Sequence, residues 1–362
     1  MSVKEARRTE LVVIYKGANI SKDISTDLVS FSYTDNESGK ADDIDITLQD
    51  SDGKWSREWA VTHGDKIEAK ILYKSEERNS YLDCGTFIVD NDSASGDVSS
   101  GTKVSIKATS LPQNNTVRRT QKNRAWEGVR LSEIATDVAN TGQLRLTYAT
   151  DIDPIFERKE QINKSDLGFL ESLINELALS LKVTKDQIVI FNRDDLEKKG
   201  SIADIVYGEN DVISWSFEDQ TDDTYSESTA EYKDPKTGKL IKHTEKDDSV
   251  KTGKVIKATQ RVENQAEAER IAKANLKNKN RKKRTGSLLL IGDVRFVSGN
   301  VITIIGFGKW DGEYYIDTAT HDLNDGYTVS LDISSTSNPK KPTEKQSKAK
   351  TKAEKAKKIE KV

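Results

Sequence analysis

Within this chain of 362 residues, the side chains that most often carry chemistry are few and scattered. Three histidines are present, His63, His243 and His321, and none has a His or Cys partner at metal-ligand spacing. The single cysteine, Cys84, excludes an intramolecular disulfide framework. It lies in the strand-like run Tyr81-Leu-Asp-Cys-Gly-Thr-Phe-Ile-Val, which favours a small core residue over a nucleophile. We therefore expect no metal site and no cysteine-based catalysis.

Two glycine-containing stretches look like nucleotide-binding loops at first sight. In Gly96-Asp-Val-Ser-Ser-Gly-Thr-Lys the residue order is wrong for a phosphate loop, and a strand rather than a helix follows. Gly306-Phe-Gly-Lys-Trp-Asp-Gly leads from one strand into another, so it cannot place a helix N-terminus at a pyrophosphate. Carboxylates are abundant, but no pair has the apolar surroundings that would raise one pKa for acid–base work. We predict no catalytic residues, no cofactor, and a protein that is not an enzyme.

Charge is unevenly distributed along the chain. The formal net charge is -3, with 34% apolar and 32% charged residues. Residues 338–362 contain ten Lys and three Glu, a net of +7, which leaves -10 for residues 1–337. The basic runs, Arg281-Lys-Lys-Arg and the Lys-rich tail, could contact phosphates, but they lack interleaved aromatic residues and are typical of solvated faces.

The sequence carries no signal for a membrane or for export. No apolar run approaches the roughly 18 residues that a membrane span needs. The N-terminal residues lack the apolar segment of a secretory signal. We expect a protein that folds in a cytoplasm and has no membrane segment.

Residues 1–115 have the pattern of an all-β barrel or sandwich. Short β-branched and aromatic runs alternate with Gly, Asn, Asp and Ser turns. Trp55 and Trp59 bracket a turn that could cap one end of this barrel, as core residues rather than a ligand platform. The predicted strands are Leu11–Tyr15, Leu28–Tyr33, Ile44–Leu48, Lys66–Leu72, Tyr81–Asp90 and Thr102–Thr109.

For residues 116–210 the sequence predicts a small α+β insert. It begins with a basic segment, Arg118–Arg124, interpreted as a solvated connector. A helix is predicted from Leu131 to a stop at Asn140-Thr-Gly, and a second helix begins after an N-cap at Ser165. Strands are expected at Leu144–Tyr148 and Gln187–Phe191.

Residues 211–337 predict a second barrel-like domain. A strand at Val212–Phe217 precedes a polar insertion, 219–252, with an exposed hairpin tip at 232–239. After a strand that begins at Lys254, helix 266–280 is expected to lie across a sheet with Ala268, Ile271, Ala272 and Leu276 on one side. Consecutive antiparallel strands then fill Gly286–Ile333, with tight turns at Asp311-Gly and Asp325-Gly. Residues 338–362 form a Lys-rich tail.

Taken together, these patterns predict a mainly β chain with an α+β insert. The order and spacing of several short motifs resemble the late control gene D family, the hub proteins of contractile phage baseplates, and the hub segment of type VI secretion spike proteins. The resemblance runs from about residue 10 to 335. The motifs are Ser32-Tyr-Thr-Asp, Ala41-Asp-Asp-Ile-Asp-Ile-Thr-Leu-Gln-Asp, Trp55, Gly64-Asp-Lys-Ile, Asp166-Leu-Gly-Phe-Leu-Glu-Ser-Leu, Ala266-Glu-Ala-Glu-Arg-Ile-Ala, Gly299-Asn-Val-Ile-Thr-Ile-Ile-Gly, Asp311-Gly-Glu-Tyr-Tyr-Ile, His321 and Gly326-Tyr-Thr-Val-Ser-Leu.

The resemblance implies a structural role in a virion or tail-like particle that is assembled in the bacterial host cytoplasm. It implies two domains of the phage tail-tube fold per chain, and a homotrimer whose ring joins a hexameric tail tube to a trimeric central spike. The implied partners are the tail tube or tube-initiator protein, the central spike, and other baseplate proteins (wedge, LysM-like or tape-measure). DNA would at most pass through an acidic lumen without specific binding.

This chain carries no spike repeat and no lytic motif of the kind fused to some relatives of that family, so spike and hydrolase would be separate proteins. His321 is expected to be a hydrogen-bonded turn residue. Two other functions stay open: a tail-associated peptidoglycan hydrolase with unrecognised catalytic carboxylates, and a carbohydrate-binding β module.

Overall fold

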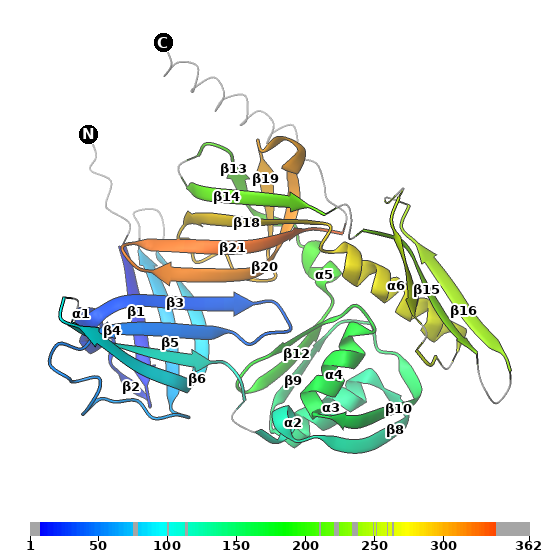
Figure 1. Cartoon of the computed structure of the whole chain (residues 1–362), viewed down its shortest axis with the longest axis horizontal. Coiled ribbons are helices and arrows are strands. Elements are labelled where there is room, and N and C mark those ends of the chain that lie inside the picture. The colour runs from blue at the N-terminus through cyan, green and yellow to red at the C-terminus, as the bar shows by residue number, and fades with distance from the viewer. Residues whose placement is uncertain are drawn as a thin grey trace, which may run out of the picture.

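The computed structural model describes residues 8–337 apart from short gaps at 75–78, 100, 113–114, 210, 221–223, 234–237, 249, 251, 259 and 263. The Lys-rich tail and the centre of the predicted hairpin tip lie outside the described residues. Figure 1 shows two β-rich halves, one above the other, with a helix-bearing module and a smaller sheet beside them. The prediction of a mainly β chain with a small α+β module is confirmed.

The first β half is built by the first seven strands, and each of the six predicted strands is present. Alternation decides which side chains enter the core: in β4, Ile44, Ile46 and Leu48 are buried while the residues between them are half-buried. Trp55 closes one end, since its indole Nε1 donates to Asp27 Oδ2 at 2.8 Å. The elements are β1 (Arg8–Tyr15), β2 (Ala18–Asn19), α1 (Ser21–Asp27), β3 (Leu28–Asn36), β4 (Asp43–Gln49), β5 (Lys66–Lys74), β6 (Asn79–Asp97) and β7 (Gly101–Thr109).

The α+β module follows. Its helix α4 begins as predicted, because the Ser165 hydroxyl accepts a hydrogen bond from the Gly168 amide at 3.2 Å. The predicted solvated connector at Arg118–Arg124 is exposed at several positions, but the prediction that it lacks regular structure was wrong. This segment forms α2 and the start of β8, and Arg124 is drawn in by three hydrogen bonds to Gln161, Asp137 and Asp166. The elements are α2 (Asn115–Arg119), β8 (Lys122–Arg130), α3 (Leu131–Gly142), β9 (Arg145–Ala149), β10 (Ile155–Lys164), α4 (Asp166–Asn175), β11 (Ser180–Val183), β12 (Gln187–Phe191) and α5 (Arg193–Glu197).

The second β half contains the strands predicted between Gly286 and Ile333 and one strand that the sequence assigned to the insert. Residues 201–206 pair with β19 in parallel, so they belong to the second half, because their apolar side chains complete its core. A short 3₁₀ turn (Gly308–Trp310) precedes β20. The strands are β13 (Ser201–Val206), β14 (Val212–Asp219), β18 (Arg284–Ile291), β19 (Val301–Ile305), β20 (Gly312–Leu323) and β21 (Tyr327–Ser335).

Strand β20 joins the two halves into one sheet of 13 strands. Its first part pairs with β19, and its second part, Thr318–Leu323, pairs with β3 of the first half. Pairing with β21 continues along both parts, interrupted by a bulge between Ile316 and Thr318. The halves are therefore held together by backbone hydrogen bonds and not by side-chain packing alone.

The chain segment that follows β14 and precedes β18 forms a separate three-stranded sheet. This sheet, called the wing, projects from the body (Figure 1). It consists of β15 (Tyr225–Lys233), β16 (Leu240–Lys246) and β17 (Lys254–Ala258), covered by helix α6 (Gln265–Asn280). The predicted apolar face of this helix is confirmed, with Ala268, Ile271, Ala272 and Leu276 buried. Within the described residues, no helix has the length and apolar character to cross a membrane.

Tyr314 provides a test of the second core. Its side chain is 1% exposed, and its hydroxyl donates to the Trp310 carbonyl at 2.9 Å. We expect Tyr314→Ala to lower the unfolding free energy by about 2–4 kcal/mol, because a large cavity remains in the core. Urea denaturation measures this change, with Tyr81→Ala, at a position 64% exposed, as the control. Equal midpoints for wild type and Tyr314→Ala would contradict the packing described here.

Candidate assembly sites

The residues that the sequence singled out for chemistry are not brought together. His63 pairs with Asp92 at 3.0 Å on the surface, and His243 lies 3.3 Å from Glu245 in the wing. Cys84 is buried in β6, and this burial raises the pKa of its thiol. Across the described parts of the chain, no group of three or more His, Cys, Asp or Glu side chains has the geometry of a metal site.

His321 is a buried link between the two halves. The expectation of a turn residue was wrong, since it lies within β20 opposite Tyr33 of β3 and is fully buried. Its Nε2 lies 2.9 Å from the Phe296 carbonyl and donates to it, while Nδ1 accepts from the Tyr327 hydroxyl at 2.8 Å. Burial lowers the pKa of His321 to about 4. The neutral ring satisfies both neighbours, which indicates a structural role.

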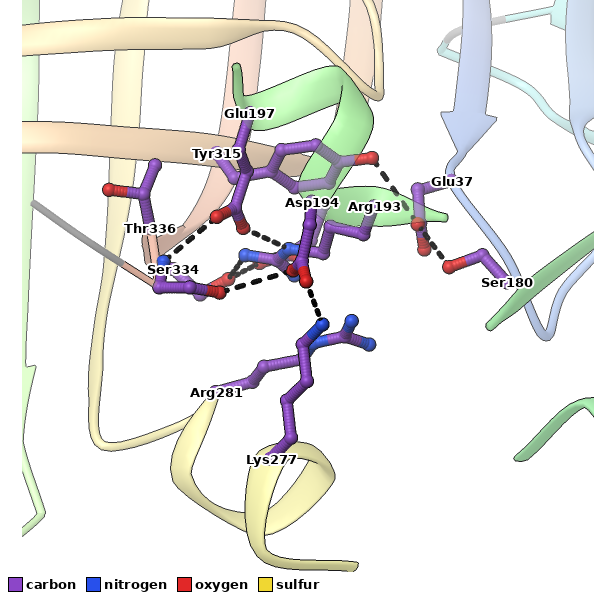
Figure 2. A network of polar contacts seen from close by, with 12 residues as sticks. Glu37, Ser180, Arg193, Asp194, Glu197, Lys277, Arg281, Tyr315, Ser334 and Thr336 are labelled. Carbon is purple, nitrogen blue, oxygen red and sulfur yellow. Dashed lines mark hydrogen bonds and ion pairs between the residues drawn. The ribbon is translucent and has the colours of Figure 1, made fainter. Parts of the chain in front are cut away.

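A polar junction forms where the β20 bulge meets helix α5. The bulge residue, Asp317, has no register partner on β21, and its carboxylate faces Arg193 at 2.7 Å. Arg193 is 4% exposed, also donates to Glu197 and Ser334, and stacks over the Tyr315 ring at 3.9 Å. Figure 2 shows Glu197, Ser334 and the Tyr315 ring around the Arg193 guanidinium. Because all its directions are taken, Arg193 fixes α5 on the second β half.

The junction also reaches the first half and the wing. Glu37, just after β3, accepts hydrogen bonds from Ser180 Oγ at 2.7 Å and from the Tyr315 hydroxyl at 3.2 Å. On the other side, Lys277 of α6 pairs with Asp194 of α5 (Figure 2). Side chains from both halves, the module and the wing therefore meet at one place.

A second buried ion cluster fixes the module against the first half. Lys182 of β11 lies 2.6 Å from Asp35 and 3.1 Å from Asp42. Asp35 also accepts from the Ser298 amide at 2.8 Å, which ties in the second half. Burial raises the pKa of Asp42 to about 6, although the Lys182 charge opposes this shift.

The sequence reasoning missed both ion clusters. One signal was available: Asp317 directly follows the aromatic and apolar run Tyr314-Tyr-Ile in a strand, where an unpaired buried carboxylate would be costly. The partner cations, Arg193 and Lys182, come from distant segments whose approach is a property of the tertiary fold.

An exposed aromatic edge marks the second half. In the described residues β14 pairs with β18 alone and β13 with β19 alone, so the sheet is open between them. Ile213 is 51% exposed and Trp215 is 46% exposed on β14, and Trp215 packs against Phe307 with ring centroids 5.3 Å apart. Phe217 is half-buried against the second core, and its ring packs over Gly286 on the paired strand, where an added Cβ would come within 2.5 Å of the ring. Such an apolar edge is suited to pairing with another chain.

Comparison with known proteins shows to which family this chain is similar. A model of YQBQ-like proteins matches residues 97–334, which is more than half of the chain. The chain belongs to the YQBQ-like family. No curated protein sequence matches this YQBQ-like chain.

Several solved structures have the same fold as this YQBQ-like chain. The 43 kDa tail protein of prophage MuSo2 from Shewanella oneidensis is 13% identical, with a TM-score of 0.68 over 90% of this chain and 98% of its own. The tail protein from Neisseria meningitidis MC58 is 13% identical, with a TM-score of 0.70 over 90% and 96%. The E. coli c3393 protein, a type VI secretion component with structural similarity to T4 tail proteins gp27 and gp5, is 10% identical, with a TM-score of 0.51 over 88% and 76%. At these identities the likeness establishes the fold.

The pH dependence of stability tests the role of His321. Its pKa of about 4 in the folded chain is below the ordinary 6.5, so between these values the unfolded chain binds more protons and stability falls as the pH decreases. We expect the difference in unfolding free energy, wild type minus His321→Gln, to be about 2 kcal/mol smaller at about pH 5.0 than at about pH 7.5.

Urea denaturation at the two pH values measures this difference. Asp42, with its pKa raised to about 6, makes stability rise as the pH decreases, which is opposite to the effect of His321. Because Asp42 is present in both proteins, subtracting their unfolding free energies removes its contribution. His243→Gln in the wing is the matched control. The assignment fails if wild type minus His321→Gln is independent of pH.

Arg193 tests the junction. Replacing it with Ala leaves Asp317 and Glu197 without their buried cation, so we expect the unfolding free energy to fall by about 3–5 kcal/mol. Lys198→Ala, which removes an exposed ion pair to Asp195 near the same helix, should leave the denaturation midpoint unchanged. Similar midpoints for both variants would show that the junction adds nothing to stability.

Proposed function

We propose that this chain is a structural hub of a contractile phage tail or of a phage-tail-like bacteriocin, related to the late control gene D proteins. In this role it forms a homotrimeric ring that adapts a hexameric tail tube to a trimeric central spike. The observation that carries the proposal is the sheet shared through β20, which fixes two barrel-like β halves side by side in one chain. Three copies of such a chain present six wall segments.

The open edge of the second half supports assembly with further copies. β14 leaves a row of backbone N–H and C=O groups unpaired by any described strand, next to the exposed Ile213 and Trp215. A neighbouring strand would satisfy these groups and cover the apolar side chains together. The junction around Arg193 supports the same role, since a ring that transmits force between tube and spike needs modules in a fixed orientation.

The division of labour follows from the proposed domains. Residues 1–115 would form one wall segment, residues 201–219 and 284–337 would form the other, residues 116–200 would lie on the outside of the ring, and residues 338–362 would attach to a neighbouring baseplate component. Partners are the tail tube or tube-initiator protein, the central spike, and wedge, LysM-like or tape-measure proteins. The acidic balance of residues 1–337 suits a lumen through which DNA passes without binding. The chain would act without enzymatic activity in the assembled particle.

Light scattering on the purified chain, alone and mixed with its co-expressed spike protein, tests this proposal. We expect a trimer mass for wild type and a monomer for Ile213→Glu, because a buried carboxylate would oppose closure at the β14 edge. Ile155→Glu, at a comparably exposed strand position of the module, should remain trimeric.

Two results would contradict the proposal. One is a wild-type chain that stays monomeric both alone and with the spike. The other is lysis of purified cell walls that disappears when a single carboxylate is replaced, which would make the protein a hydrolase.

A further inference from the structure

A cleft of about 890 Å³ opens beside the polar junction, where the C-terminal end of α6 faces the loop after β3. Its lining includes Glu37 and Lys40 from the first half, Asp317 from the second, and Lys279, Arg281 and Lys282 at the end of α6. This cleft has no part in the ring proposed above, and ligand binding in it does not depend on that ring.

The carboxylates in the cleft wall already have hydrogen-bond partners. Glu37 accepts hydrogen bonds from Ser180 and Tyr315. Asp317 is paired with Arg193, whose remaining donors are taken by Glu197 and Ser334. Asp317 is therefore occupied by Arg193, whereas Glu37 keeps its charge and attracts Arg281 without a direct ion pair.

In the described part of the chain, Lys40, Lys279, Arg281 and Lys282 form no ion pair. Arg281 donates weakly to the Ala178 carbonyl at 3.3 Å, and its buried Nε has no hydrogen-bond partner. Burial, together with the nearby charge of Arg193, lowers the pKa of Arg281, although the carboxylates of Glu37, Asp194 and Glu197 oppose this shift. In Figure 2 its guanidinium lies beside Lys277 without a bond to any other residue drawn.

We propose that this cleft binds an acidic, extended segment of a partner protein. Carboxylates entering the cleft would pair with Lys279 and Lys282 at its rim and give Arg281 a direct hydrogen-bonded ion pair, which it does not form with any described residue. The chain's own tail does not fit, because it carries a net +7. Duplex DNA fits less well than a peptide, because its closely spaced phosphates would extend from this cleft over a body with a net charge of -10.

Fluorescence anisotropy with the full-length chain and a fluorescein-labelled hexaglutamate peptide tests the proposal, with hexaglutamine as the neutral probe. We expect hexaglutamate to bind more tightly, and its affinity to fall about tenfold in Lys279→Gln/Lys282→Gln. Lys40→Gln, on the opposite wall, should weaken binding independently. The matched control, Lys257→Gln/Lys273→Gln, removes the same charge from exposed positions outside the cleft and should bind as wild type.

The replaced lysines are exposed, so circular dichroism and the melting temperature should match wild type in every variant. Three results would overturn the proposal. These are an equal loss of affinity in the control variant, no preference for hexaglutamate over hexaglutamine, and tighter binding of a short DNA duplex that the cleft variants abolish.

Discussion

Strand β20 carries a constraint on which the whole arrangement depends, because it must satisfy hydrogen bonds to three neighbours. It pairs with β19 near its start, with β3 near its end, and with β21 along both parts. β19 and β3 share one edge of β20 in succession, and the bulge at Asp317, in the pairing with β21, lies where this partner changes. The same bulge turns a carboxylate toward α5. The strand that joins the halves thus also carries, at its bulge, the carboxylate that anchors the module.

Buried charge at this anchor sets orientation more than it adds stability. An ion pair such as Arg193–Asp317 has to offset the desolvation of both groups, and an apolar contact of similar size could hold the parts equally well. Directional hydrogen bonds add a defined angle, because Arg193 and Glu37 each satisfy several partners in one geometry. Lys182, between Asp35 and Asp42, has the same effect between the module and the first half.

The surfaces differ in a way that suits an assembly component. The side chains at the interior junctions have several partners each. Among the described residues, by contrast, the β14 edge pairs with β18 alone, and Lys40, Lys279, Arg281 and Lys282 in the cleft at α6 form no direct ion pair. One surface suits strand pairing and the other suits charge recognition. A protein that works by fitting its neighbours needs fixed internal angles together with unsatisfied outer surfaces, and this chain has both.

By itself, the sequence determined the mainly β character, most strand positions, the helix after Ser165 and the apolar face of α6, because these follow from local periodicity and capping. Local pattern could not place Ser201–Val206 in the second half, bury His321 within β20, or turn Arg118–Arg124 from a connector into a helix and a paired strand. It also gave no means of joining Arg193 to Asp317, 124 positions apart. Those features arise from contacts between segments that are distant in the sequence. A charged residue whose partner lies far along the chain has the same local sequence pattern as a solvated one, so only the fold identifies the pair.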